Sequence, residues 1–176
     1  MNNINLIGYR CSGKSSVGMK LAGVLQRPFV DADAVFIEQT AVSITDFVAK
    51  SGWEEFRRIE SRILLDLSQR DNIILATGGG VVLNSDNRLV LQESGVNFWL
   101  QTSEKTVLTR LVADSVSVSQ RPALSSLSLE DEIVSGLKER EPFYRVVADY
   151  SIVVDDLSVD EVASQILSQY RGGGDG

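Results

Sequence analysis

Short apolar runs alternate along the chain with longer segments in which apolar residues recur every three or four positions. Residues 4–7 (INLI) form the first apolar run and are typical of a β-strand. The segment that begins at Gly13 places Val17, Leu21 and Leu25 on one face, which is the spacing of an amphipathic helix. The same alternation continues along the chain. It predicts strands over residues 29–33, 72–77, 96–101 and 150–154, and helices over 43–52, 53–70, 85–94, 103–113, 129–148 and 158–170.

This alternation of strands and helices predicts a three-layer α/β fold, in which a parallel five-stranded sheet has helices on both faces. The run over residues 72–77 (NIILAT) is as apolar as a strand that is buried on both faces. We expect Pro142 to interrupt the helix over 129–148, because proline lacks a backbone N–H donor. Residues 1–170 then form a single domain, and residues 171–176 (RGGGDG) form a flexible tail.

The composition of the 176 residues is ordinary for a globular protein, with 43% hydrophobic and 23% charged residues. The net charge of −7 does not favour nucleic-acid binding. The chain has no histidine, which excludes histidine catalysis and histidine metal ligands, and its single cysteine, Cys11, cannot form an intramolecular disulfide. We see neither a signal peptide nor an apolar run long enough to cross a membrane, and we expect a cytoplasmic protein.

Residues 8–15 (GYRCSGKS) match the pattern Gly-x-x-x-x-Gly-Lys-Ser/Thr and lie between the first strand and the first helix. In this pattern the glycines let successive backbone N–H groups point at phosphate oxygens, and the N-terminus of the following helix adds a positive dipole end. Lys14 supplies a mobile positive charge for the β- and γ-phosphates, and the Ser15 hydroxyl is suited to bind Mg²⁺. We therefore expect nucleotide binding by Gly8, Arg10, Cys11, Ser12, Gly13, Lys14, Ser15 and Ser16.

The phosphate loop by itself does not identify the acceptor of the phosphate, because GTPases, motors and small-molecule kinases all use such a loop. The chain lacks the Asn-Lys-x-Asp signature of a GTPase, and a short chain with no extra domain disfavours a motor. Residues after other predicted strands are candidates, because the carboxyl ends of parallel strands meet at one edge of the sheet. We expect Gly8, Asp31, Asp33 and Gly78–Gly80 to share that edge.

Further motifs follow the phosphate loop in a fixed order. They are FVDAD (29–33), GWEEFRRIES (52–61), ATGGGVV (76–82), QRPAL (120–124) and REPFYRVVAD (140–149). Together with the phosphate loop, this series resembles the shikimate kinases over about residues 4–155. The resemblance implies the P-loop fold of the nucleoside-monophosphate kinases, with a substrate-binding region near residues 32–60 and a lid near residues 112–126.

The resemblance also implies roles for residues on the substrate side. Arg57 and Arg140 match two family arginines that bind the substrate carboxylate, a task that suits the forked guanidinium group. Asp33 matches the acid that contacts the substrate hydroxyls, and in a chain without histidine a carboxylate is the natural acceptor for the hydroxyl proton. The substrate-binding glycines of the family match Gly78, Gly79 and Gly80, where the lack of a Cβ atom lets a ligand approach the backbone.

On the nucleotide side, Asp31 matches the first acid of the family motif, and we expect it to hold Mg²⁺ together with Ser15. Arg121 matches the lid arginine that moves over the phosphates, and the resemblance implies that it acts in catalysis with Lys14 and Asp33. Arg110, at the start of the lid, matches a family position near the nucleotide, although an exposed arginine on a helix is usually only solvated.

Several residues allow a second interpretation. Asp31 and Asp33 are also suited to cap a helix that follows them, but we expect capping to explain one acid poorly and both not at all, because both lie at a strand end beside the phosphate loop. Cys11 is either a redox-sensitive thiol near a helix N-terminus or a small side chain at an unconstrained position of the loop. Glu60 is spaced either to brace Arg57 or to form only a surface ion pair with it.

The resemblance implies an enzyme that converts shikimate and ATP to shikimate 3-phosphate and ADP in aromatic amino-acid biosynthesis. It also implies Mg²⁺ as cofactor and a monomer as the working form. Two alternatives remain: a gluconate or nucleoside-monophosphate kinase of the same fold, and a non-catalytic ATP-binding regulator. The presence of Lys14, Asp33 and Arg121 argues against the regulator. We expect neither a nucleic-acid partner nor a membrane association.

Overall fold

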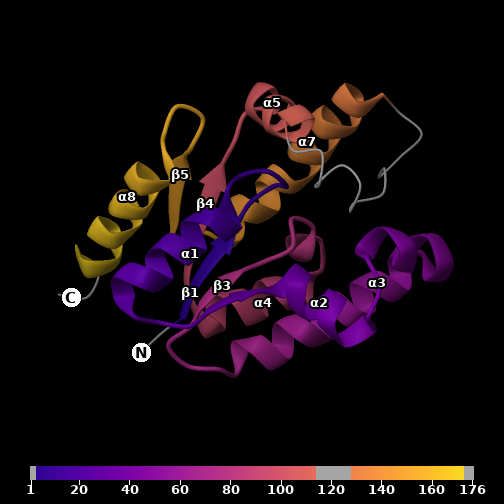
Figure 1. Cartoon of the computed structure of the whole chain (residues 1–176), viewed down its shortest axis with the longest axis horizontal. Coiled ribbons are helices and arrows are strands. Elements are labelled where there is room, and N and C mark those ends of the chain that lie inside the picture. Colours follow the sequence, from indigo (N-terminus) through magenta and orange to yellow (C-terminus); the bar gives the residue numbers. More distant parts are fainter. Residues whose placement is uncertain (1–2, 114–127, 173–176) are drawn as a thin grey trace.

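A five-stranded parallel sheet forms the centre of the computed structural model, which describes residues 3–113 and 128–172 (Figure 1). The strands are β1 (Asn3–Ile7), β2 (Phe29–Asp31), β3 (Ile74–Ala76), β4 (Gly95–Gln101) and β5 (Tyr150–Val153). Their order across the sheet is β2-β3-β1-β4-β5, and all four neighbouring pairs are parallel. The predicted parallel α/β sheet of five strands is therefore confirmed.

Helices cover both faces of the sheet. They are α1 (Lys14–Leu25), α2 (Ala32–Thr40), α3 (Ile44–Ser68), α4 (Ser85–Ser94), α5 (Glu104–Ala113), α7 (Leu129–Val147) and α8 (Val159–Gly172), with a 3₁₀ turn η1 (Val81–Leu83). Leu6 of β1 packs with α1 and α8, whereas the next residue, Ile7, packs with α3, α4 and α7 (Figure 1). This alternation follows from the two-residue period of a strand and gives the sheet two buried faces.

The region after β2 differs from the prediction. The expected strand over residues 29–33 ends at Asp31, and the unpredicted helix α2 begins at the next residue. The Asp31 side chain is the cause, because it accepts hydrogen bonds from the backbone N–H groups of Asp33 and Ala34 and so caps the helix. Asp33 consequently lies in the first turn of α2 and not at the end of a strand.

The expected helices over residues 43–52 and 53–70 form two parts of α3, which meet at Gly52. Gly52 has φ 81° and ψ 167°, a backbone conformation that interrupts the helical path. Ser43 caps the first part, because its side chain accepts a hydrogen bond from the backbone N–H of Asp46 at 3.1 Å.

The expected interruption at Pro142 is wrong, because α7 continues through this residue. Ile133 before the proline and Tyr144 and Val147 after it are all buried, so packing holds both parts of the helix in line. The proline itself is exposed.

α8 extends to Gly172, two residues beyond the expected end of the helix, while residues 173–176 lie outside the described part of the chain. None of the helices that the structure describes is long and apolar enough to cross a membrane.

Candidate active site

The phosphate loop joins β1 to α1 with the backbone geometry that its glycines permit. Gly8 has φ 144°, and a Cβ atom at this position would lie 2.6 Å from the carbonyl oxygen of Leu100. Gly13, with φ 92°, immediately precedes the first residue of α1. The loop therefore brings the N-terminus of α1, the positive end of the helix dipole, to the carboxyl edge of the sheet, where it favours an anion.

A cavity of about 590 Å³, called the larger cavity below, lies beside this loop. Its size is within the range of small-molecule sites. Arg110 reaches it from α5 and donates hydrogen bonds to the backbone oxygens of Cys11, at 3.1 Å, and Val154, at 3.0 Å. Arg110 is thus anchored at the cavity and is not merely solvated. The lining includes residues 11–16, Asp31, Asp33, Thr77, Arg110, Val154, residues 157–159 and Val162.

Lys14 lies folded over the loop, and its side chain is buried. Its ammonium group donates hydrogen bonds of 2.8 Å to the backbone oxygens of both Gly8 and Tyr9. These carbonyls hold the charge close to the larger cavity, which Lys14 also lines. A phosphate there would have a compact cation within reach of a small side-chain movement.

Asp31 performs two tasks with its two oxygens. Its Oδ1 atom accepts from the backbone N–H of Asp33 at 2.9 Å, and its Oδ2 atom accepts from the Ser15 hydroxyl at 2.6 Å. Asp31 therefore does cap the helix, which corrects our expectation, whereas capping does not account for Asp33. The Ser15 and Asp31 oxygens lie together at the larger cavity, and this oxygen donor set fits Mg²⁺, which prefers one or two carboxylates together with phosphates and water.

A second cavity of about 60 Å³, called the smaller cavity below, lies next to the larger one. Its lining comes from separate segments of the chain and consists of Arg10, Asp33, Ile44, Trp53, Phe56, Arg57, Glu60, Gly78, Gly79, Gly80 and Arg140. Asp33 lines both cavities. The structure thus brings together Asp33, Arg57, the three glycines and Arg140, as the sequence predicted.

An ion pair and two aromatic rings hold the Arg57 side chain in place. Its Nη1 atom donates to Oε2 of Glu60 at 2.6 Å, and its guanidinium carbon lies 5.4 Å from the centre of the Trp53 ring and 5.1 Å from that of Phe56. Glu60 is buried, so the bracing interpretation describes this pair better than a surface ion pair does. Burial raises the pKa of Glu60, with a further contribution from the nearby Asp33 carboxylate, while Arg57 acts in the opposite direction.

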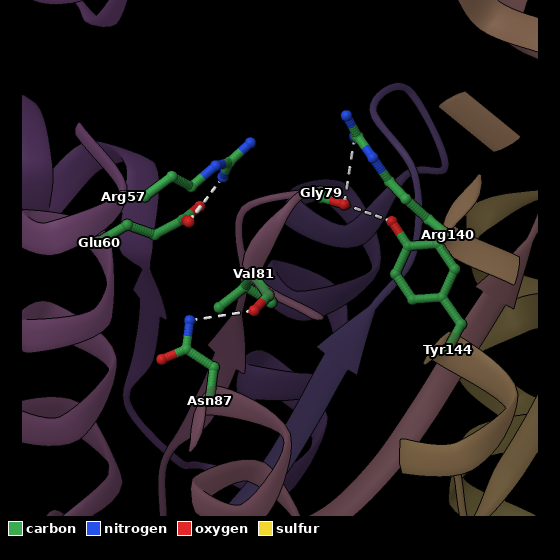
Figure 2. Close-up of polar contacts among 7 residues, drawn as sticks. All are labelled: Arg57, Glu60, Gly79, Val81, Asn87, Arg140 and Tyr144. Carbon is green, nitrogen blue, oxygen red and sulfur yellow. Dashed lines mark hydrogen bonds and ion pairs between the residues drawn. The ribbon is translucent and has the colours of Figure 1, made fainter. Parts of the chain in front are cut away.

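Arg140 enters the smaller cavity from α7, opposite Arg57 (Figure 2). Its Nη1 atom donates to the backbone oxygen of Gly79 at 3.4 Å, and the Tyr144 hydroxyl donates to the same oxygen. Burial raises the pKa of Tyr144, which keeps this hydroxyl protonated and able to donate. Arg140 also lies over the Tyr9 ring, 5.1 Å from its centre. Figure 2 shows the guanidinium groups of Arg57 and Arg140 on opposite sides of the site, with Gly79 beside that of Arg140.

The three glycines provide space for the charged side chains of the smaller cavity. A Cβ atom on Gly80 would overlap the Arg57 guanidinium, and one on Gly78 would lie 2.5 Å from Glu60 Oε1 and 3.1 Å from Asp33 Oδ1. We expected these glycines to admit a ligand to the backbone. The structure adds that their absent side chains also let Arg57, Glu60 and Asp33 pack against the turn.

Two predicted nucleotide-binding residues lie elsewhere. Arg10 lines the smaller cavity and not the larger one, because its side chain turns towards α7 and forms an ion pair with Glu132 at 2.5 Å. Gly8 forms the turn itself and is not among the residues that line the larger cavity. Arg121 and most of the predicted lid over residues 112–126 lie outside the described residues. Sequence reasoning missed Glu132, which stands among several acids at the start of α7 with no motif to distinguish it.

A phosphate loop that faces a large cavity, with a small cavity of arginines and a shared carboxylate beside it, defines the protein as a P-loop small-molecule kinase. The sequence model of the family described as shikimate kinase matches residues 10–171. The chain belongs to the shikimate kinase family. It is accordingly a phosphotransferase that uses ATP as co-substrate and an alcohol group of a small molecule as acceptor.

Individual relatives agree with this assignment. The chain is 38% identical to a shikimate kinase of Syntrophus aciditrophicus (strain SB), over 96% of this chain and 91% of the relative. It is 39% identical to a shikimate kinase of Legionella pneumophila (strain Corby), over 98% of this chain and 96% of the relative. Among solved structures, shikimate kinase from Acinetobacter baumannii in complex with shikimate is similar with a TM-score of 0.93 and 32% identity, over 100% of this chain and 96% of that one.

Proposed function

We propose that the protein transfers the γ-phosphoryl group of ATP to the 3-hydroxyl of shikimate and releases ADP and shikimate 3-phosphate. The observation that carries this proposal is that Asp33 lines both cavities, so one carboxylate lies where the contents of the two sites meet. The similar Acinetobacter baumannii enzyme was solved in complex with shikimate, which supports this choice of substrate.

In the larger cavity, the N–H groups of the phosphate loop and the N-terminus of α1 bind the phosphates of ATP. Lys14 leaves the carbonyls of Gly8 and Tyr9 and bonds the β- and γ-phosphates, where it balances the charge that develops during transfer. Ser15 and Asp31 hold Mg²⁺, directly or through water. When bound, the ion neutralises phosphate charge.

In the smaller cavity, Arg57 and Arg140 bind the carboxylate of shikimate from two sides. Asp33 lines the same cavity, so a ring held there by the two arginines can present a hydroxyl group to this carboxylate. Asp33 accepts a hydrogen bond from the attacking hydroxyl and takes its proton as the new O–P bond forms and the bond from the γ-phosphorus to the β,γ-bridging oxygen breaks. Positioning of the two reactants supplies much of the rate, because the transition state of phosphoryl transfer is loose.

Further features of the proposal rest on family membership. Residues 1–170 form one kinase domain with a substrate-binding region over about residues 32–60. The family resemblance assigns to about residues 112–126 the role of a lid that excludes water, and to Arg121 a contact with the phosphates; Arg121 and most of this range lie outside the described residues. The enzyme works as a monomer with Mg²⁺ in the cytoplasm, a reducing compartment in which a chain with one cysteine is typical.

The test is an ADP-release assay with purified protein, Mg-ATP and a panel of acceptors: shikimate, gluconate and nucleoside monophosphates. We expect turnover with shikimate and release of ADP in a 1:1 ratio with shikimate 3-phosphate, measured by mass spectrometry. Turnover with another acceptor in place of shikimate would replace the substrate but keep the reaction class. ATP binding without transfer to any acceptor would contradict the proposed function.

A further inference from the structure

A buried ion pair connects the phosphate loop to α7. Nη2 of Arg10 donates to Oε1 of Glu132 at 2.5 Å, and the two side chains are only 9% and 5% exposed. By contrast, the ion pair of 2.6 Å between Lys20 and Asp160 joins two helices at the surface, with side chains 47% and 72% exposed. Buried partners are costly to separate, whereas exposed pairs contribute little. The Arg10–Glu132 pair therefore fixes the loop and the helix relative to each other.

Arg10 marks the position in the phosphate loop at which successive residues stop lining the smaller cavity and begin to line the larger one. Residues 11–16, which follow it directly, line the larger cavity, whereas Arg10 lines the smaller one. Because Arg10 is covalently continuous with the phosphate-binding residues, a nucleotide that fixes these residues also fixes the backbone of Arg10. The loop thus has one part in each site.

α7 provides the matching connection on the other side. Glu132 and Arg140 lie eight residues apart on this helix, which corresponds to about 12 Å. The Tyr9 ring packs between the loop and the helix, with the guanidinium carbon of Arg10 5.7 Å and that of Arg140 5.1 Å from its centre. Gly136 leaves the space for this ring, because a Cβ atom there would lie 2.6 Å from the Tyr9 hydroxyl. Loop and helix are therefore in contact over two helical turns.

Two hydrogen-bond donors among these arginines lack an acceptor. The Nε atoms of Arg10 and Arg140 are buried, and neither has a hydrogen-bond partner within the described part of the chain. Both residues are more than nine-tenths buried and line the smaller cavity. Buried donors are normally satisfied, so both Nε–H groups are suited to an acceptor that enters this cavity, such as a carboxylate oxygen.

We propose that the Arg10–Glu132 ion pair couples the two ligand sites, so that a nucleotide in the larger cavity tightens the binding of an anionic substrate in the smaller one. Glu132 is a positioning residue in this scheme. Its charge holds Arg10 beside the like-charged Arg140 over the Tyr9 ring, and the nucleotide-bound loop then presents Arg10 to the same carboxylate that Arg57 and Arg140 bind. This inference rests on the proposed function, because it takes shikimate as the anion.

The coupling is measured as the ratio of two dissociation constants for shikimate, one without nucleotide and one with saturating Mg-ADP. Trp53 lines the smaller cavity and gives an intrinsic fluorescence signal, while the only other tryptophan, Trp99, is buried in the core. We expect Mg-ADP to lower the dissociation constant of the wild-type protein about fivefold or more. In Glu132→Gln and in Arg10→Gln the ratio should fall to within twofold of unity, and the double variant should show no further loss.

The matched control is Asp160→Asn, which removes the exposed pair and should retain the wild-type ratio. If Glu132→Gln does not fold, the ratio is compared between Arg10→Gln and Arg10→Lys. Lysine preserves the charge and should preserve part of the coupling, whereas glutamine should abolish it. A wild-type ratio in either glutamine variant, or a wild-type ratio of one, would overturn the inference. Absence of any shikimate binding to the wild-type protein would instead contradict the proposed function.

Discussion

The two cavities are built in opposite ways. The larger one takes most of its phosphate-binding groups from consecutive residues, 11–16, and relies on backbone N–H groups and a helix N-terminus. The smaller one takes charged and aromatic side chains from the loop, α2, α3 and α7, which surround the backbone of Gly78–Gly80. Phosphate recognition is therefore largely local in the sequence and combines backbone groups with side chains of one loop, whereas recognition of the acceptor depends on side chains that only the complete fold brings together.

The cavities also differ in how charge is balanced. Lys14 donates hydrogen bonds to the backbone oxygens of Gly8 and Tyr9 and to the Ser12 hydroxyl, all within its own loop. In the smaller cavity, Arg57 is paired with Glu60 and Arg10 with Glu132, and both acids are buried. Each of these arginines is held in a defined position before the substrate arrives, at the cost of desolvating a carboxylate. The substitutions below separate these two designs.

Lys14→Ala should have the largest effect and should affect only the larger site. Removal of a cation that stabilises the transferring phosphoryl group should lower kcat by about 1000-fold. The dissociation constant of shikimate in the absence of nucleotide should change by less than about twofold, because Lys14 does not line the smaller cavity. ADP release and Trp53 fluorescence measure the two quantities. Lys20→Ala, at an exposed position of the same helix, is the control; a loss of shikimate binding in Lys14→Ala would contradict the separation of the sites.

Arg57→Ala tests the smaller site in the same way. Loss of one half of the carboxylate clamp should weaken shikimate binding by about 2–5 kcal/mol, seen as a higher KM for shikimate, while the KM for ATP stays nearly constant. The neighbouring Arg58→Ala is a suitable control, because Arg58 pairs with Glu55 on the exposed side of α3. An unchanged KM for shikimate in Arg57→Ala would refute the assignment of the clamp.

Gly80→Ala sharpens the comparison by adding a single methyl group. A Cβ atom there overlaps the Arg57 guanidinium, and displacement of this group should cost about 1–3 kcal/mol of shikimate binding with little effect on ATP. Gly23→Ala in α1 is the matched control, since no heavy atom of the described chain lies within 4 Å of its Cβ position. Steady-state kinetics with each substrate varied in turn distinguish the outcomes; equal behaviour of the two variants would show that Arg57 needs no space at the turn.

Glu60→Gln should produce the smallest effect, on the pH dependence of stability. Burial raises the pKa of Glu60, so the stabilisation that comes from its neutral form is complete below the unfolded-state pKa of about 4.3 and is lost as the pH rises through the folded-state pKa. Glutamine cannot ionise. The free energy of unfolding of the variant, relative to wild type, should therefore increase from about pH 4 to about pH 8.

Thermal unfolding across this pH range provides the measurement, with about 2–4 °C in Tm for each kcal/mol. Glu55→Gln is the control, because the hydrogen bond from Arg58 lowers the pKa of the exposed Glu55 carboxyl and the slope should be small and of opposite sign. A difference between Glu60→Gln and wild type that does not vary with pH would show that Glu60 has the same pKa in both states.

The sequence predicted those features that depend on local patterns. The alternation of strands and helices was sufficient for the sheet, and Gly13 and Lys14 identified the phosphate loop because its glycines and lysine lie within eight residues. Helix α2 was missed, since its beginning depends on one side-chain cap by Asp31 at the end of a three-residue strand. The continuity of α7 through Pro142 was also missed, because packing against distant residues outweighs one absent hydrogen bond.

The residues of the candidate site also fall into those that the sequence identified and those that it did not. Arg57, Arg140 and the three glycines were found through motifs that resemble a known family, not through any periodicity. The position of Arg10 in the smaller cavity was not predictable, because its direction is set by Glu132, which lies 122 residues away in the sequence. Contacts of this kind depend on tertiary packing, and no local pattern identifies them.

The kink in α3 has a consequence for how the walls of the smaller cavity are specified. Ile44 and Trp53 belong to this lining and lie on either side of Gly52, whose φ of 81° and ψ of 167° are open almost exclusively to glycine. No heavy atom of the described chain lies within 4 Å of its Cβ position, so crowding does not select the residue. The backbone conformation that only glycine adopts readily at position 52 thus sets the angle between the two parts of α3, and with it the relative position of Ile44 and Trp53 in the wall of the acceptor pocket.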